Sequence, residues 1–377
     1  MKKILIIFTL FLSNYIYAEC YELNYTDCLY WSEYCEWNDE ADECQEIGGD
    51  GSGNTDGPYQ YATITESQGL RNGPDYRDGV LYYPIDAETP YKSIVLTPGW
   101  GSNGASMSNW AQYFASHGFI AMTIGPNDEI NDSHQQRAEG LLDGIETIVE
   151  ENSRESSPIN GMIDINNFSV CGYSMGGGAS QIAATYDNSI VSVISLNPTV
   201  IFEDCEVCPE EDGYCICLVP EFLDHPVPTL IYEGETEINE MPEYDGLLGE
   251  DCYENTPETT EKILFEVAGD GHGATYAPYG EIAYYVLYWL NYQVLDDNSY
   301  CELLLNIPST SSQYLTNLDC IDSIIGDING DLIVNVQDII LTVNLILNNE
   351  YNILGDINLD NAVDVLDIVQ LINIILN

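Results

Sequence analysis

Positive charge is the scarcest feature of this sequence. The 377 residues include 8 Lys and Arg against 63 Asp and Glu, for a net charge of −55 at pH 7. A surface this acidic repels nucleic acid and anionic lipid, so neither is expected as a partner. Such a surface stays soluble where salt screens its self-repulsion, which leads to the hypothesis of a saline habitat.

Long apolar runs are also missing. Beyond the N-terminus, no run approaches the ~18 apolar residues that a membrane-spanning helix needs, so no membrane span is predicted. Residues 1–18 combine two lysines, a short apolar core and a small residue at the end, which is typical of a secretory signal peptide. The protein is therefore predicted to be secreted or extracellular, where its 12 cysteines favour disulfides over free thiols.

Composition divides the sequence into several segments. The glycine-rich run that begins at Gly48 is too polar and too permissive to fold, so it is interpreted as a linker. The predicted segments are a signal peptide at 1–18, a cysteine-rich module at 19–47, a flexible linker at 48–56, a catalytic domain at 57–322 and a tail domain at 323–377.

The cysteine-rich module is too small to hold a core without cross-links. Its four cysteines, Cys20, Cys28, Cys35 and Cys44, predict two disulfides. Its tyrosines and tryptophans allow two interpretations, a binding face for carbohydrate or polymer and simple packing within the module.

Strand-like and helix-like segments alternate through the catalytic domain. The strand-like segments are mostly continuous apolar runs, as expected for parallel strands that are buried on both faces. The pattern predicts an α/β fold with a mostly parallel sheet flanked by helices. The predicted strands are 94–96, 119–124, 168–171, 190–196, 229–232 and 263–267.

A serine lies where one of these strands meets a helix. Ser174 is the centre of the motif Gly172-Tyr173-Ser174-Met175-Gly176, between an apolar run and a small-residue stretch. Glycines two residues on either side let the strand and the helix approach closely while the sharp turn exposes the serine Oγ. This context predicts a nucleophile elbow, and Cys171, just before it, is expected to be buried and inert.

A serine nucleophile needs a histidine base, and the chain has only four histidines. His272 lies in a glycine-rich loop between the predicted strand 263–267 and a helix-like run at 280–292. It comes after the serine, as the base does in α/β-hydrolases. His117 and His134 precede the serine, and His117 is interpreted as structural. His225 lies just before the strand 229–232, a less suitable place than that of His272.

The acid that orients the base is expected just after strand 229–232. Glu237, expected at the tip of the loop that follows this strand, is placed for this role, with Glu235 and Asp245 as rivals in a chain rich in carboxylates. Acyl transfer also needs two N–H groups for the oxyanion. The amide of Met175, after the serine, is one candidate, and that of Trp100, after strand 94–96, is the other. The Trp100 indole would then overhang the acyl pocket.

Taken jointly, these motifs resemble the bacterial cutinase and polyester-hydrolase branch of the α/β-hydrolases, which includes the PET hydrolases. The resemblance covers about residues 57–320 and implies hydrolysis of carboxylic esters without a catalytic metal. It selects Glu237 as the acid, and it implies a disulfide between Cys301 and Cys320. The motifs that carry it are Pro98-Gly99-Trp100, Ala115 to Phe119, Gly172 to Gly178, Pro228 to Ile231 and Gly269 to His272.

Three departures from the family bear on the substrate. Glutamate replaces the usual aspartate as the acid, and this is chemically tolerable because either carboxylate can hold the imidazole in the correct tautomer. Thr199 stands where the polyester hydrolases carry a tryptophan, so half of an aromatic substrate clamp is missing, and the resemblance implies that Thr199 and Trp100 contact the substrate. An insertion at 205–224 would form a cap near the site. Its Cys205, Cys208, Cys215 and Cys217, with Cys252, allow zinc or disulfides, and an oxidising compartment favours disulfides.

The tail contains two calcium-loop patterns, 327–338 and 356–367, at a 29-residue offset. Oxygen ligands recur at loop positions 1, 3, 5, 9 and 12, with a backbone carbonyl at position 7. An amphipathic helix follows each loop, at 339–348 and 368–376. Two calcium ions are predicted. The first set of ligands is Asp327, Asn329, Asp331, Ile333, Asn335 and Asp338, and the second is Asp356, Asn358, Asp360, Ala362, Asp364 and Asp367.

These loops and helices resemble a type I dockerin module, which implies docking to a cohesin-like partner on a scaffold or cell surface. Val336-Gln337 and Val365-Leu366 occupy the positions that often carry specificity in dockerins. The sequence thus predicts a secreted serine ester hydrolase that acts on an ester or polyester. A capped small-ester, feruloyl or lipid esterase and a catalytically silent tethered binding module are the alternatives.

Overall fold

The computed structural model describes residues 57–200, 218–320, 326–329, 333–348, 352–358 and 362–376, together with the backbone of four short strands within 1–56. The chain divides into two compact units, Met1–Leu318 and Asp319–Asn377. Most of the predicted signal peptide, cysteine-rich module and linker, and most of the predicted insertion at 205–224, lie outside the described residues.

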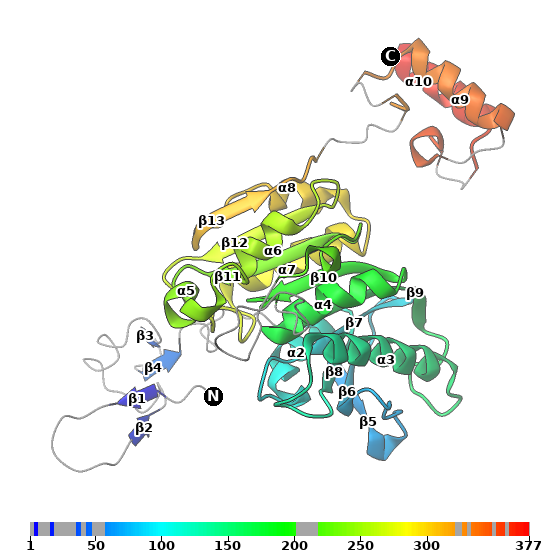
Figure 1. The fold of residues 1–377 in the computed structure, drawn as a ribbon. Helices are drawn as coiled ribbons and strands as arrows, with labels where there is room; N and C mark the ends of the chain where they lie inside the picture. The colour runs from blue at the N-terminus through cyan, green and yellow to red at the C-terminus, as the bar shows by residue number, and fades with distance from the viewer. Residues whose placement is uncertain are drawn as a thin grey trace. The chain divides into compact units, whose positions relative to one another are not determined.

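A nine-stranded sheet forms the centre of the first unit, in the order β13-β12-β11-β10-β9-β7-β8-β6-β5 (Figure 1). The strands from β8 to β12 in this order are parallel, and β5, β6 and β13 pair antiparallel at the two edges. The bounds are β5 Tyr61–Thr65, β6 Arg77–Pro84, β7 Tyr91–Thr97, β8 Ile120–Gly125, β9 Ile163–Tyr173, β10 Ile190–Leu196, β11 Thr229–Gly234, β12 Lys262–Val267 and β13 Ser311–Thr316.

Helices cover both faces of this sheet. The α-helices are α2 Ser108–Ser116, α3 His134–Ser153, α4 Met175–Tyr186, α5 Glu237–Glu240, α6 Gly249–Asn255, α7 Gly280–Gln293 and α8 Cys301–Leu304. Short 3-10 segments are η2 Glu66–Gln68, η3 Gly104–Met107, η4 Pro220–Phe222, η5 Pro242–Tyr244 and η6 Asn298–Tyr300.

Two hydrophobic cores lie on opposite faces of the sheet because successive side chains of a strand point to opposite sides. Val95 of β7 packs with side chains of α3 and α4, such as Leu141 and Ile182. Its neighbour Leu96 packs with side chains of α2 and α7, including Trp110 and Trp289. The sheet is therefore buried on both faces, which fixes the positions of the strand ends that carry the site.

This architecture agrees with the predicted α/β-hydrolase fold. Each of the six predicted strands corresponds to a parallel strand of the sheet, and the helix-like run near residue 280 is α7. Cys301 and Cys320 are both disulfide-bonded. Cys171 and Cys252 are buried and free. The prediction that groups Cys252 with the cysteines of the insertion is wrong, because Cys252 is a buried free thiol within α6.

The remaining elements belong to the N-terminal segment and the tail. In the N-terminal segment β1 Ile4–Ile6 pairs with β2 Ile16–Ala18, and β3 Cys35–Asn38 pairs with β4 Glu43–Glu46. The tail has η7 Ile353–Gly355 and two helices, α9 Val336–Asn348 and α10 Val365–Leu376, each of which starts three residues before its predicted start. Among the described residues, no helix has the length and apolar character that crossing a membrane requires.

Candidate active site

Ser174 occupies a strained turn between β9 and α4. Its backbone has a φ of 57° and a ψ of −120°, a conformation that residues other than glycine rarely adopt. The flanking glycines make the turn possible. A Cβ added to Gly172 would lie 2.0 Å from the carbonyl oxygen of Gly176, and one added to Gly176 would lie 2.3 Å from that of Thr97. The turn thus has the geometry of a nucleophile elbow.

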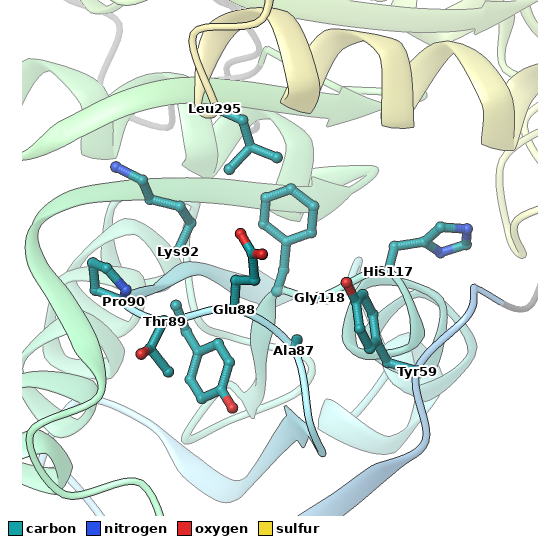
Figure 2. A pocket seen from close by; sticks show the side chains of 11 residues that line it. Tyr59, Ala87, Glu88, Thr89, Pro90, Lys92, His117, Gly118 and Leu295 are labelled. Carbon is teal, nitrogen blue, oxygen red and sulfur yellow. The ribbon is translucent and has the colours of Figure 1, made fainter.

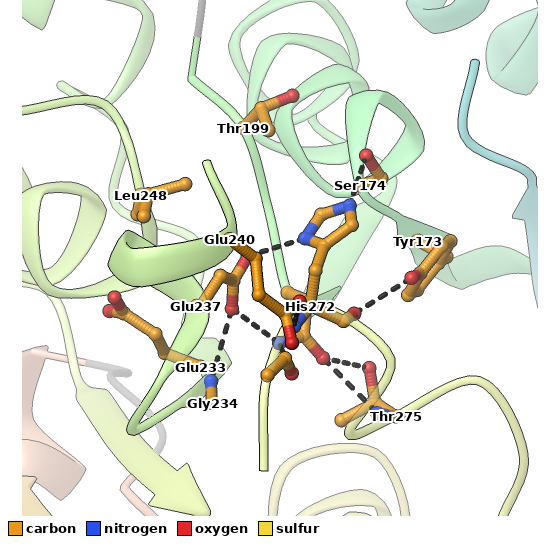
Figure 3. A network of polar contacts seen from close by, with 12 residues as sticks. Tyr173, Ser174, Thr199, Glu233, Gly234, Glu237, Glu240, Leu248, His272 and Thr275 are labelled. Atoms are coloured by element: carbon orange, nitrogen blue, oxygen red, sulfur yellow. Dashed lines mark hydrogen bonds and ion pairs between the residues drawn. The ribbon is translucent and has the colours of Figure 1, made fainter. Parts of the chain in front are cut away.

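One hydrogen-bonded chain joins the three predicted triad residues (Figure 3). The distance from His272 Nε2 to Ser174 Oγ is 2.9 Å, and that from His272 Nδ1 to Glu237 Oε1 is 2.5 Å. The Glu237 side chain is fully buried, whereas the His272 side chain keeps 20% of its surface exposed. A ring held between a carboxylate and a hydroxyl is placed to accept the hydroxyl proton, as general-base chemistry requires.

The buried carboxylate of Glu237 is held by groups that the sequence did not reveal. Its Oε2 accepts hydrogen bonds from Asn197 Nδ2 at 2.6 Å and from the Gly234 amide at 3.0 Å. The Asn197 Oδ1 accepts in turn from the amide and the hydroxyl of Thr275, at 3.1 and 2.6 Å. Glu237 was expected at the tip of a loop, but it begins the short helix α5. Asn197 therefore ties the acid to the loop of the base.

The loop that carries His272 is fixed from two sides. The Tyr173 hydroxyl donates to the His272 carbonyl at 2.7 Å, and the His272 amide donates to Glu240 Oε2 at 3.0 Å. Both amide and hydroxyl of Thr236 donate to the Asp270 carbonyl. Because these contacts join residues far apart in the sequence, no local motif reports them.

One of the two rival carboxylates, that of Glu235, and the other histidines have different partners. Glu235 Oε2 accepts from the Gly269 amide at 2.7 Å. His117 Nδ1 lies 2.8 Å from the Tyr113 carbonyl at the end of α2, His134 Nε2 lies 2.8 Å from the Thr199 carbonyl, and His225 Nε2 lies 2.8 Å from Gln181 Oε1. Burial lowers the pKa of both His134 and His225 to about 4, so both are neutral near pH 7.

The predicted oxyanion residues come from two elements beside the serine. Met175 begins α4, and the amides of a first helical turn have no partner within their helix. The loop after β7 approaches from the other side, because a Cβ added to Gly99 would lie 2.8 Å from Ser174 Cβ. Trp100 follows that glycine. Its indole Nε1 donates to the Ile130 carbonyl at 3.0 Å, and 61% of the residue is exposed.

Thr199, predicted to contact substrate, is buried beside the elbow. Its hydroxyl lies 3.2 Å from His134 Nε2, and its amide donates to the Ser174 carbonyl at 3.2 Å. Exposed aromatic surface is found at Trp100 and at Tyr276, whose ring packs edge-on against Tyr173 at a centroid distance of 5.9 Å. Tyr279, whose hydroxyl donates to Asp270 in the loop of His272, is a further exposed aromatic residue, whereas position 199 adds no aromatic surface.

A second carboxylate is buried next to the acid. Glu233, on β11, accepts a hydrogen bond from the Glu250 amide. Burial, together with a smaller effect of the nearby charge of Glu237, raises the pKa of Glu233 to about 8. Glu233 therefore carries a proton at neutral pH.

A cavity of about 320 Å³ lies away from the triad, at the ends of β7 and β8 where these strands begin (Figure 2). Lys92, Glu88, His117 and Tyr59 are among its lining residues. Parallel strands place their carboxyl ends, and with them Ser174, at the opposite edge of the sheet. The cavity is therefore separate from the ester site.

Comparison with known proteins finds a matching family and several related hydrolases. Residues 50–207 match the family described as PET hydrolase-like. The chain is 27% identical to Cutinase est2 of Thermobifida alba over 262 residues, which cover 67% of this chain and 76% of that protein. It is 26% identical to Cutinase cut1 of Thermobifida fusca, with 67% and 70% covered. It is also 26% identical to the bis(hydroxyethyl) terephthalate hydrolase of Streptomyces coelicolor, with 68% and 74% covered.

These relatives are carboxylic ester hydrolases. The prediction of this enzyme class is confirmed. The matched family segment contains Trp100, Ser174 and Met175 but ends before Glu237 and His272.

Proposed function

We propose that the protein is a secreted serine hydrolase that cleaves carboxylic esters through Ser174, His272 and Glu237. The observation that carries this proposal is the continuous hydrogen-bonded chain from Ser174 Oγ through His272 to the buried Glu237 carboxylate. The strained elbow beneath Ser174 supports it, because such strain persists where it serves a function.

The reaction proceeds in two halves. Ser174 Oγ attacks the ester carbonyl carbon while His272 Nε2 accepts the hydroxyl proton, and the Met175 and Trp100 amides stabilise the oxyanion. The carbon–oxygen bond to the alcohol then breaks, and His272 returns the proton to the leaving alcohol. Water, deprotonated by the same imidazole, then attacks the acyl carbon, the bond from this carbon to Ser174 Oγ breaks, and His272 returns the proton to Ser174 as the acid is released. Glu237 keeps Nδ1 of His272 protonated and stabilises the imidazolium form.

An extended ester, such as a cutin-like or synthetic polyester, is the proposed substrate. The exposed faces of Trp100 and Tyr276 offer stacking surface for acyl groups, in keeping with relatives named cutinase and terephthalate hydrolase. Buried Thr199 supplies no aromatic clamp, which favours a small-ester, feruloyl or lipid substrate as the alternative.

Ester turnover by the wild type and by Ser174→Ala tests the proposal. Activity of the wild type alone on both p-nitrophenyl butyrate and a polyester film is expected. Activity on the soluble ester alone would select the small-ester alternative. An inactive wild type, or a Ser174→Ala variant as active as the wild type, would contradict the proposal, and inactivity on both substrates would favour the silent binding module.

For the tail, we propose two calcium sites in a dockerin-like domain. The two loops repeat the same contacts: Asp338 accepts hydrogen bonds from the amides of Ile328, Asn329 and Asn335, and Asp367 from those at 357, 358 and 364. Both aspartates are fully buried. Residues 319–377 contain no Lys, Arg or His, so no cationic side chain of the tail compensates these carboxylates.

A bound cation would compensate this buried charge, and the oxygen donors suit calcium. Asp331 and Asp360 of the two ligand sets lie outside the described residues, and the described residues alone contain no metal-binding group of three or more acidic, His or Cys side chains. Titration of the full chain should reveal two calcium sites, with one lost in Asp338→Ala and the other in Asp367→Ala. Failure to bind calcium would contradict the proposal.

We also propose that the tail docks to a cohesin-like protein through its helices. Val336 and Ile340 of α9 and Val365 and Leu366 of α10 are exposed apolar side chains. Replacing Val365 and Leu366 by aspartate should abolish capture by an immobilised cohesin in calcium without changing ester turnover. Unchanged capture would contradict this role of α10.

A further inference from the structure

Arg137 is one of only 8 cationic residues of the chain, and it is buried. It lies in the first turns of α3, with 1% of its surface exposed. Burying a guanidinium costs several kcal/mol unless hydrogen bonds and opposite charges compensate it. Two of its three nitrogens donate to backbone carbonyls, Nη1 to that of Pro98 at 3.2 Å and Nη2 to that of Glu129 at 3.0 Å, whereas its buried Nε has no hydrogen-bond partner among the described residues.

Both carbonyls belong to segments that build the oxyanion loop. Pro98 precedes Gly99 and Trp100. The carbonyl of Glu129 also accepts the Gly101 amide at 2.8 Å, and the next carbonyl, that of Ile130, accepts the Trp100 indole at 3.0 Å. Gly101 is therefore bound directly to Glu129, and Pro98 is linked to the same residue through Arg137.

The elbow closes the same arrangement from the other side. A Cβ added to Gly176 would lie 2.8 Å from the Pro98 carbonyl oxygen, so this carbonyl lies between the start of α4 and the guanidinium of Arg137. A shift of Pro98 would move Gly99, on which an added Cβ would lie only 2.8 Å from Ser174 Cβ. The position of the Trp100 amide relative to Ser174 thus depends on a peptide that Arg137 holds.

Charge compensation fits a fixed guanidinium. Burial lowers the pKa of Arg137, and the nearby carboxylates of Asp132 and Glu129 oppose this shift because they stabilise the charged form. Glu129 pairs with Arg77, and Asp132 accepts the Asp128 amide at 2.9 Å, so both acids are themselves fixed. Arginine suits this place because its planar fork reaches two carbonyls at once, whereas lysine is a single point charge.

We infer that Arg137 is a positioning residue for the oxyanion hole, which it serves by fixing the peptide before Gly99 and Trp100. The inference rests on the proposed function, since the oxyanion belongs to that reaction. It predicts that Arg137 acts on the transition state more than on binding of the ground-state ester, because the loop amide contacts the oxygen only once charge develops there.

The test uses two variants. Arg137→Met removes the hydrogen bonds to Pro98 and Glu129 but keeps a side chain of similar length, and Arg137→Lys keeps the positive charge. Loss of one oxyanion donor lowers kcat about 10²- to 10³-fold in other hydrolases, so a misplaced donor should cost less. We expect kcat for p-nitrophenyl butyrate to fall roughly 10- to 100-fold in Arg137→Met, with KM within about two-fold. Arg137→Lys should lie between this variant and the wild type.

A trifluoromethyl ketone gives an independent readout. Ser174 Oγ bonds to its carbonyl carbon and the proton moves to His272, so a stable oxyanion occupies the hole. The inhibition constant should rise in parallel with the fall in kcat/KM. Arg154→Met is the matched control, because Arg154 caps the other end of α3, where it pairs with Glu151, and its kcat and inhibition constant should stay at wild-type values.

Wild-type kcat and inhibition constant in either Arg137 variant would overturn the inference. An equal fall in the Arg154→Met control would also overturn it, because the effect would then be one of helix stability. If Arg137→Met does not fold, the Arg137→Lys variant decides by the same two readouts. Wild-type turnover by Ser174→Ala would instead contradict the proposed function, so the two failures are distinguishable.

Discussion

At the scale of single residues, Asn197 shows how much of the site depends on one polar side chain. Its backbone is in the left-handed region, with a φ of 45°, and its amide group joins Glu237 to Thr275. Removing one partner of a buried hydrogen bond leaves the other unsatisfied, at a cost of about 1–3 kcal/mol. This cost is expected for Glu237, because its side chain is fully buried and no water can replace the hydrogen bond from Asn197.

The variant Asn197→Gly tests this role without straining the backbone, because glycine accepts a positive φ. We expect kcat/KM for p-nitrophenyl butyrate to fall about ten-fold, because the carboxylate of Glu237 loses the hydrogen bond from Asn197. The melting temperature should fall as well. Wild-type kcat/KM in a folded Asn197→Gly variant would show that the Gly234 amide alone suffices to orient Glu237.

Glu233 predicts a pH dependence of stability. Its folded pKa, raised to about 8 by burial, exceeds the ordinary glutamate value of 4.5. As pH rises, the unfolded chain therefore loses this proton at a lower pH than the folded protein does. The contribution of the protonated form to the free energy of unfolding is complete below about pH 4.5 and is lost as pH rises through about 8. Within this window the free energy of unfolding falls by up to roughly 1.4 kcal/mol per pH unit.

The isosteric variant Glu233→Gln should lack this loss. Urea unfolding at pH 5, 6.5 and 8 measures the free energy of unfolding of both proteins. The variant should gain stability relative to the wild type as pH rises through this window. A constant difference between the two proteins across the three pH values would show that Glu233 keeps an ordinary pKa.

At the scale of elements, the strand-to-helix turn has no spare room. The variant Gly176→Ala would force its methyl against the carbonyls of Thr97 and Pro98, which are backbone atoms. We expect at least a 100-fold loss of kcat and a lower melting temperature, since a misplacement of about 1 Å can cost this much. For stability, Gly273→Ala is the control, because its methyl meets nothing within 4 Å. Equal melting temperatures in both variants would show that a methyl group at position 176 does not clash with the carbonyls of Thr97 and Pro98.

The parallel strands could be predicted from the sequence because burial on both faces leaves continuous apolar runs. The edge strands could not. β5 and β13 are partly exposed and rich in Ser and Thr, so their sequences lack such a run. The four-residue helix α5 is too short to leave a periodic pattern, which is why Glu237 was assigned to a loop.

The same distinction holds in the site. Ser174 and His272 could be predicted because they lie in local glycine motifs and because histidine is scarce. Asn197 and Glu240 could not be, since their contacts with Glu237 and His272 join segments 40 and 32 residues apart. Such contacts are set by tertiary packing and leave no mark in the nearby sequence.

At the scale of the whole molecule, charge predicts a response to salt. A net charge of −55 creates self-repulsion that ions screen within about 10 Å at 0.1 M. We expect the free energy of unfolding to increase between 0.05 and 0.5 M NaCl, the range chosen for the test. Choline chloride at the same ionic strength should give the same increase, because screening is not specific for the ion. Stability that does not change with salt would contradict this view.

The central claim is that Ser174 is the nucleophile of an ester hydrolase. Labelling of the full chain with a fluorophosphonate, followed by peptide mass spectrometry, tests it most directly, because the probe forms a serine O–P bond and releases fluoride. One adduct on Ser174 is predicted, formed with loss of ester turnover and absent from Ser174→Ala and His272→Ala. Full ester turnover with Ser174 labelled, or an adduct on another residue that abolishes turnover, would contradict the claim.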